Sequence, residues 1–134
     1  MTVWGPRPVA DRDSLEWWRR VRGHELPVQR CSGCGTLRFP ARAYCPSCRG
    51  ARWEWHATDG RGRVLSWIVA RRRFAAEPEP PYTVVMVCLE QAPACVLYGA
   101  WRAGREPVPD EPVRVRFEDV PGEDLTLLAW HPAR

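Results

Sequence analysis

The sequence predicts a mainly β protein that begins with one helix, continues through a four-cysteine metal-binding module and ends in a five-stranded β-barrel. Four cysteines form two closely spaced pairs in the segment CSGCGTLRFPARAYCPSC (31–48). Beyond them, short runs of β-branched and aromatic residues alternate with prolines and glycines. A chain of 134 residues, 45% of them hydrophobic, can bury one core, with or without a small appended module.

The helix is expected within the segment DRDSLEWWRRVRGHEL (11–26). Its expected caps are Asp13 or Ser14 at the start and Gly23 at the end. Leu15, Trp18 and Val21 recur at a spacing of three residues and predict one apolar stripe, from which Trp17 is rotated by about 100°. With tryptophans on two faces, the helix either packs on its own domain or offers one face to a partner.

The two Cys-x-x-Cys pairs predict a metal site. The candidate ligands are Cys31, Cys34, Cys45 and Cys48. The N-terminus shows no secretory signal, so we expect a cytoplasmic, reducing environment in which such pairs bind metal rather than form disulfides. Four thiolates fill the tetrahedral coordination of Zn²⁺ and predict a closed structural site. Iron is the alternative, although the cysteine pairs of rubredoxins lie further apart in sequence.

Strands are expected over residues 52–58, 62–73, 81–90, 94–101, 111–120 and 125–133. Asp59-Gly60 resembles a hairpin turn between the first two of them. The last five strands are expected to close into a small barrel, because closure removes unprotected edges.

Alternation in the strand 111–120 predicts one buried and one solvated face. The inward residues would be Val113, Val115 and Phe117, and the outward ones Arg114, Arg116 and Glu118. The acidic pairs Asp110–Glu111, Glu118–Asp119 and Glu123–Asp124 are interpreted as solvated residues of turns and strand ends.

Charge divides the chain into two halves. All twenty basic residues are arginine, and residues 1–73 hold fifteen of them against six acids, a balance of +9. Residues 74–134 hold five arginines against ten acids, a balance of −5. Such asymmetry indicates either a surface for an anion or the solvated face of a small domain. No apolar run approaches the roughly 20 residues needed to cross a bilayer, so we expect no membrane segment.

The order of these parts resembles one family. A short helix, then HELPVQRCSGCGTLRFPARAYCPSC, WEW, GRGRVLSW and PPYTVVMVCLE are similar to the rubredoxin-like zinc-ribbon plus OB-fold family, an acyl-CoA-associated domain of unknown function. The likeness covers about residues 13–132. It implies an N-terminal tail and helix over 1–28, a zinc ribbon over 29–58 and an OB-fold barrel over 59–134.

The resemblance also implies a function. Members typically lack catalytic residues and bind thiolase-fold enzymes, either thiolases or thiolase-like aldolases of steroid side-chain breakdown. The expectation is therefore an accessory subunit with structural Zn²⁺, in a heterotetramer or larger assembly whose partner mainly holds the acyl-CoA. A MaoC-like enoyl-CoA hydratase is a second candidate partner. No catalytic residue is assigned to this chain.

Two sets of residues are candidates for contacts. The expected partner interface consists of Trp17, Trp18 and Trp67, and the expected contacts to CoA phosphates or an acidic partner face are Arg71, Arg72 and Arg73. Packing within the chain and a solvated arginine run are the structural alternatives. Single-stranded nucleic-acid binding is the alternative function, and the acidic balance of the barrel half disfavours it.

Overall fold

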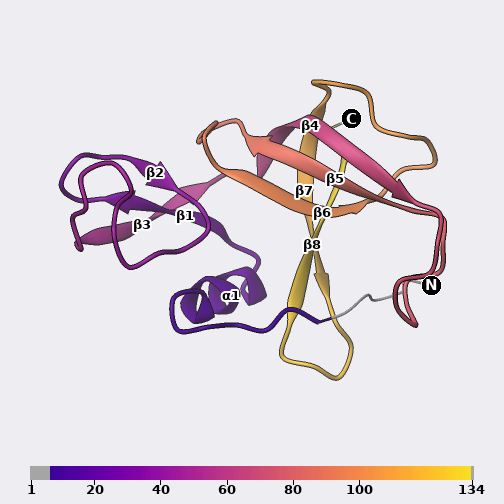
Figure 1. Cartoon of the computed structure of the whole chain (residues 1–134), viewed down its shortest axis with the longest axis horizontal. Helices are drawn as coiled ribbons and strands as arrows, with labels where there is room; N and C mark the ends of the chain where they lie inside the picture. Colours follow the sequence, from indigo (N-terminus) through magenta and orange to yellow (C-terminus); the bar gives the residue numbers. More distant parts are fainter. Residues whose placement is uncertain (1–6, 134) are drawn as a thin grey trace.

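The computed structural model of the chain describes residues 7–133, so the first six residues of the expected tail and Arg134 lie outside the described residues. In chain order the elements are α1 (Leu15–Arg22), β1 (Leu26–Cys31), β2 (Leu37–Arg38), β3 (Trp53–Thr58), β4 (Arg61–Ala70), β5 (Tyr82–Leu89), β6 (Val96–Trp101), β7 (Pro112–Asp119) and β8 (Thr126–Pro132). Figure 1 shows β1–β3 at one end, the barrel of β4–β8 at the other, and α1 beside their junction. The described helix is too short and too polar to cross a membrane.

The ends of α1 follow from local hydrogen bonds. The Ser14 hydroxyl accepts a bond from the Asp11 amide, and the Asp11 carboxylate accepts one from the Ser14 amide. This reciprocal turn places Ser14 at the N-cap. Gly23 follows the last turn, and His24 then adopts a left-handed φ of 62°, which stops the helix and redirects the chain into β1.

The expected apolar stripe of the helix is correct for Val21, which is buried, and for Trp18, which is half-buried against the core, but it is wrong for Leu15 and it leaves out Trp17. Trp17 and Val21 are the buried pair, with 5% and 0% of their surface exposed, whereas Leu15 is 45% exposed. The buried residues lie four positions apart rather than three. The Trp17 indole N–H donates to the Pro27 carbonyl oxygen at 3.0 Å, so the one polar atom of this side chain is satisfied inside the core.

The small sheet β2–β1–β3 carries the metal-binding module. The buried side-chain amide of Gln29 ties the loop to the sheet, because its oxygen Oε1 accepts bonds from the Arg42 backbone N–H and from Arg38 Nε. The side-chain nitrogen Nε2 of Gln29 and Nη2 of Arg38 both donate to the backbone carbonyl oxygen of Arg42. These bonds fix the course of the chain between the two cysteine pairs.

The remaining strands form the closed barrel β4–β5–β6–β8–β7, which confirms the five-stranded prediction. The expected hairpin at Asp59-Gly60 is wrong, because β3 pairs with β1 while β4 pairs with β5 and β7. This turn instead carries the chain from the small sheet into the barrel. Gly60 has a φ of 74°, and a Cβ there would lie 2.4 Å from Val115 Cγ1, so only glycine fits.

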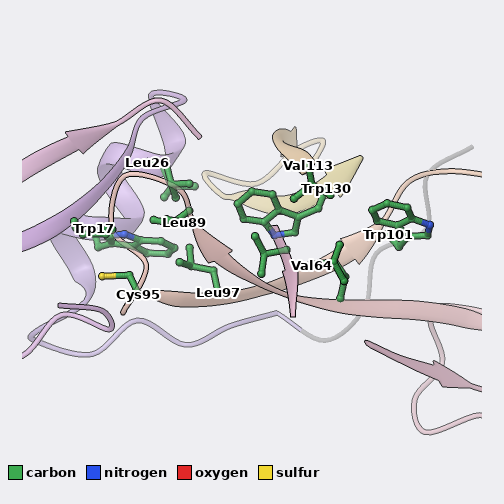
Figure 2. Packing of buried hydrophobic residues seen from close by; sticks show 14 residues of the cluster. Trp17, Leu26, Val64, Leu89, Cys95, Leu97, Trp101, Val113 and Trp130 are labelled. Carbon is green, nitrogen blue, oxygen red and sulfur yellow. The ribbon is translucent and has the colours of Figure 1, made fainter. Parts of the chain in front are cut away.

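One hydrophobic core runs through the whole molecule. Trp17 of the helix and Leu26 of β1 lie beside Leu89, Leu97 and Cys95 of the barrel side (Figure 2). The core continues inside the barrel to the fully buried Trp130. The helix and the small sheet therefore pack on the barrel rather than hang from it.

The prediction for Glu118 is wrong. Alternation places this residue on the wet face of its strand, but it is only 7% exposed. Its two carboxylate oxygens each accept a bond of 2.8 Å from Arg102, and Arg116 Nε lies 3.2 Å away. A buried carboxylate is stable here because a guanidinium from the end of β6 neutralises it.

Candidate functional site

The four cysteines of the two pairs meet at one point. The sulfurs of Cys31, Cys34, Cys45 and Cys48 all lie within 4.8 Å of one another. Two contacts are shorter, 3.5 Å between Cys31 and Cys48 and 3.6 Å between Cys34 and Cys45. A tetrahedral ion with metal–sulfur bonds of about 2.3 Å needs sulfurs about 3.8 Å apart. The residues therefore fit a four-coordinate metal, and four protein ligands leave no open position for water.

The electrostatics of the cluster favour a cation. Backbone amides point at three of the sulfurs, each at 3.4 Å: Gly33 to Cys31, Ser47 to Cys45 and Gly50 to Cys48. The Cys48 amide is the main cause that lowers the pKa of Cys45 to about 6. The Gly50 amide lowers the pKa of Cys48, but the neighbouring thiols, beginning with Cys31, outweigh it and raise that pKa to about 11. A bound metal would relieve this competition among the sulfurs.

A groove of about 1130 Å³ lies between α1, the start of the metal-bearing loop and the outer side of the barrel. Its apolar lining comes from segments far apart in sequence and includes Trp17, Trp18, Phe39, Tyr98, Trp101 and Leu128. Trp17 packs against Trp18 and Phe39 at ring-centroid distances of 4.8 and 5.1 Å. The helix and the metal-binding module thus supply one wall of the groove, and the barrel supplies the other.

The charges around the groove are mostly neutralised by neighbours. Arg102 is paired with Glu118, as described above. Arg105 forms two bonds to Glu111, at 2.8 and 2.9 Å, and this guanidinium is the main cause that lowers the pKa of Glu111. Arg71 also lines the groove and forms no ion pair with any residue in 7–133. It is therefore a cation left available at the rim.

The three tryptophans named from the sequence lie in different places. Trp17 is buried in the core and shows only a small part of its surface to the groove. Trp18 is half-buried and lines the groove. Trp67 is half-buried on β4 and does not line the groove, but its indole N–H donates to Glu106, a lining residue, at 3.2 Å. Trp18 consequently offers the most accessible aromatic surface of the three at this site.

The three consecutive arginines also separate. Arg71 lines the groove, and Arg72 is exposed beyond the end of β4. Arg73 donates to the Ala76 carbonyl oxygen and is paired with Glu79, so it holds its own loop together.

Several residues that line the groove were not predicted from the sequence. Phe39 lies in an irregular segment between the cysteine pairs, and no local pattern marks it. Tyr98 could have been predicted from the sequence, because it follows Leu97 in an apolar strand and alternation places the two on opposite faces. In the structure Leu97 is buried and Tyr98 is 60% exposed. A large aromatic side chain on the outer side of a barrel indicates a contact surface.

Comparison with known proteins gives the family. Residues 18–54 match the family model "ChsH2, rubredoxin-like zinc ribbon domain", and residues 55–118 match "ChsH2, C-terminal OB-fold domain". The chain belongs to the ChsH2 family. This assignment confirms the resemblance drawn from the sequence. Together with the four close sulfurs, it indicates that a metal at this site would be structural.

A solved structure of the ChsH2 family resembles the whole chain. The Ltp2-ChsH2(DUF35) aldolase matches with a TM-score of 0.85 and 31% identity, over 96% of this chain and 100% of that one. The 3-oxo-4,17-pregnadiene-20-carboxyl-CoA hydratase alpha subunit of Mycobacterium tuberculosis is 30% identical over 94% of this chain and 40% of its own length. A DUF35 domain-containing scaffold protein of Methanocaldococcus jannaschii is 31% identical over 62% of this chain and 61% of its own length.

The chain is shorter than two hydratase alpha subunits that it matches, a probable enoyl-CoA hydratase alpha subunit of Thermomonospora curvata and the one from Mycobacterium tuberculosis. It spans 27% and 40% of the lengths of the two hydratase alpha subunits that it matches. It therefore corresponds to one part of those longer proteins.

Proposed function

We propose that the chain is a non-catalytic accessory subunit that binds a thiolase-fold enzyme and completes part of its acyl-CoA site or channel. The partner would be a thiolase or a thiolase-like steroid side-chain aldolase, in a heterotetramer or larger assembly. The observation that carries the proposal is the match to the Ltp2-ChsH2(DUF35) aldolase over the entire length of that chain. The scaffold-protein name of the archaeal relative points the same way. A MaoC-like hydratase is the second candidate partner, because other relatives are hydratase alpha subunits.

The groove supports a contribution to acyl-CoA binding. Its aromatic and aliphatic lining suits an acyl chain or ring system, and its volume of about 1130 Å³ slightly exceeds the roughly 300–1,000 Å³ typical of small-molecule sites. Arg71 at the rim suits a phosphate group, because guanidinium groups bind phosphate oxygens in pairs. Trp18, Trp67 and Arg72 remain proposed partner contacts. The partner would supply the nucleophile and the general acid or base.

The metal has a structural part in this proposal. Zinc suits the four thiolates best, and in the ribbon it would fix the segment that carries Phe39 into the groove wall. We place the complex in the cytoplasm, where thiols stay reduced.

The proposal is tested by recovering and reconstituting the complex. The tagged chain is purified from its native host under mild conditions, and co-purifying proteins are identified by mass spectrometry. The expected result is a thiolase-fold enzyme in stable stoichiometric amount, whose cleavage of an acyl-CoA rises when the purified chain is added back. Recovery of no thiolase-fold protein, or unchanged activity after reconstitution, would contradict the proposal. Arg71→Ala should raise the KM for acyl-CoA, whereas Arg114→Ala, on an exposed part of β7, should not.

A further inference from the structure

The arginines of the ribbon differ from those of the rest of the chain. On the helix and the barrel, most arginines are paired with acids of the same chain, as in the pairs Arg22–Asp124, Arg63–Glu90, Arg102–Glu118 and Arg105–Glu111. The ribbon arginines form no ion pair with any carboxylate among residues 7–133. They are Arg30, Arg38, Arg42, Arg49 and Arg52. Four of these side chains are exposed, and only Arg38 is buried.

Charge in the ribbon exceeds what its own groups neutralise. Residues 29–58 hold five arginines and one acid, Glu54, a net charge of +4. Glu54 lies opposite Arg30 in the register of β1 and β3, yet the two form no ion pair. A divalent ion with four thiolates would carry a net charge of −2, which still leaves +2 on the ribbon. The arginines are therefore more numerous than the metal site requires.

The ribbon exposes a large aromatic side chain in addition to its arginines. Tyr44 lies on the loop between the cysteine pairs and is 65% exposed, close in sequence to the exposed Arg42. Tyrosine and arginine are among the side chains enriched at the centres of interfaces. The ribbon strands β1–β3 lie at the opposite end of the molecule from most of the barrel (Figure 1).

We propose that the exposed ribbon arginines dock onto an acidic face of the partner enzyme. This inference rests on the proposed function. It adds an electrostatic contact surface on the ribbon to the one formed by the groove. A protein partner fits better than a polynucleotide, because an OB-fold barrel would have to carry the strand, and residues 74–134 have a net charge of −5. Unpaired cations on one partner steer the encounter with acids on the other and set its salt dependence.

The test reverses charge in the ribbon and compares it with the same change elsewhere. Arg42→Glu with Arg52→Glu changes two exposed side chains whose guanidinium groups form no hydrogen bond or ion pair within residues 7–133. The control combines Arg12→Glu with Arg114→Glu, which alters the net charge equally at exposed positions outside the ribbon. Affinity for the thiolase-fold enzyme recovered above is measured by calorimetry at low and high NaCl. The ribbon double variant should bind about tenfold or more weakly at low salt, and its affinity should depend less on salt. The control double variant should lose no more than about twofold in affinity.

The outcomes separate this inference from the proposed function. Equal losses in the two double variants would show a mere net-charge effect and overturn the docking surface. An unaltered affinity in the ribbon variant, with the wild-type complex intact, would also overturn it and leave the accessory role standing. If the wild type binds no thiolase-fold enzyme, the proposed function itself fails. Salt-dependent binding of a single-stranded oligonucleotide that the ribbon variant loses would assign the surface to nucleic acid instead.

Folding of the variants is checked independently. Zinc content and far-UV circular dichroism should match the wild type, because neither guanidinium group forms a hydrogen bond or an ion pair with the four cysteines. If the glutamate pair loses its metal, the neutral pair Arg42→Gln with Arg52→Gln replaces it. That pair should show about half of the loss in binding free energy, since it removes the charges without inverting them. An undiminished affinity of the neutral pair would overturn the inference.

Discussion

Removing the Trp17 indole should destabilise the entire chain rather than one module. This side chain is 5% exposed and belongs to the core cluster that continues into the barrel. It contacts Trp18 and Phe39 and donates its N–H to the Pro27 carbonyl oxygen. Because one side chain joins helix, ribbon and barrel, its loss should lower the stability of all three together.

The magnitude follows from the buried area. A tryptophan side chain buries about 200 Å², and at about 25 cal/mol per Å² this amounts to about 5 kcal/mol for complete removal. Substitutions of a buried tryptophan by alanine cost about 3–5 kcal/mol. The Pro27 carbonyl also loses a donor. We therefore expect Trp17→Ala to cost about 4 kcal/mol, a large part of the roughly 5–15 kcal/mol that stabilises a domain.

Two further variants keep the measurement decisive. Trp17→Phe preserves most of the bulk and removes the N–H donor, so it should cost about 1–2 kcal/mol. Trp18→Ala removes a half-buried neighbour and should cost less than Trp17→Ala. Stability is measured by urea unfolding followed by far-UV circular dichroism, which does not depend on tryptophan emission. The reasoning is refuted if Trp17→Ala costs under about 1.5 kcal/mol, or if Trp18→Ala costs as much.

Three other perturbations have defined expected results. Stripping the metal with a chelator under reducing conditions should make the loop 39–52 the first site of limited proteolysis, and added Zn²⁺ should restore protection; an unchanged cleavage pattern would argue against a structural ion. Glu118→Gln should cost about 2 kcal/mol in urea unfolding because it removes the charge that neutralises Arg102, whereas Glu123→Gln, in an exposed pair, should cost under about 1 kcal/mol. Gly60→Ala should lower the midpoint of thermal unfolding clearly, since the added Cβ would lie 2.4 Å from a methyl group of Val115. Gly104→Ala should leave the midpoint unchanged, because its Cβ would meet no atom within 4 Å. Equal midpoints for the two variants would contradict the close approach of Gly60 to Val115.

Local sequence patterns predicted most of the architecture. Each barrel strand combines β-branched and aromatic residues between glycine or proline breaks, so its existence and approximate limits depend on nearby residues alone. The sulfur cluster was predictable for a similar reason. Two Cys-x-x-Cys turns each preorganise a pair of ligands, and a single metal then requires the pairs to meet.

Features that depend on distant residues could not be predicted in this way. Both Trp17 and Trp18 fit an amphipathic helix, and only the position of the Pro27 carbonyl and Phe39 decides which ring is buried. Glu118 occupies an outward position by alternation, but the parallel pairing of β6 with β8 brings Arg102 against it. The groove itself exists only once the helix packs on the barrel.

The metal site and the groove are mechanically connected, although no ligand cysteine lines the groove. Phe39, which lines the groove, directly follows β2. The strand β2 pairs with β1, where Gln29 lies opposite Arg38, and β1 ends at the ligand Cys31. Loss of the ion would loosen the loop that holds Phe39 against Trp17, and the groove would lose the wall that these rings form. A structural metal in this position would therefore affect the proposed ligand or partner binding without touching either, through the packing of Phe39 against Trp17. The proposed acyl-CoA groove would thus depend on a closed four-cysteine site that contributes no ligand cysteine to its lining.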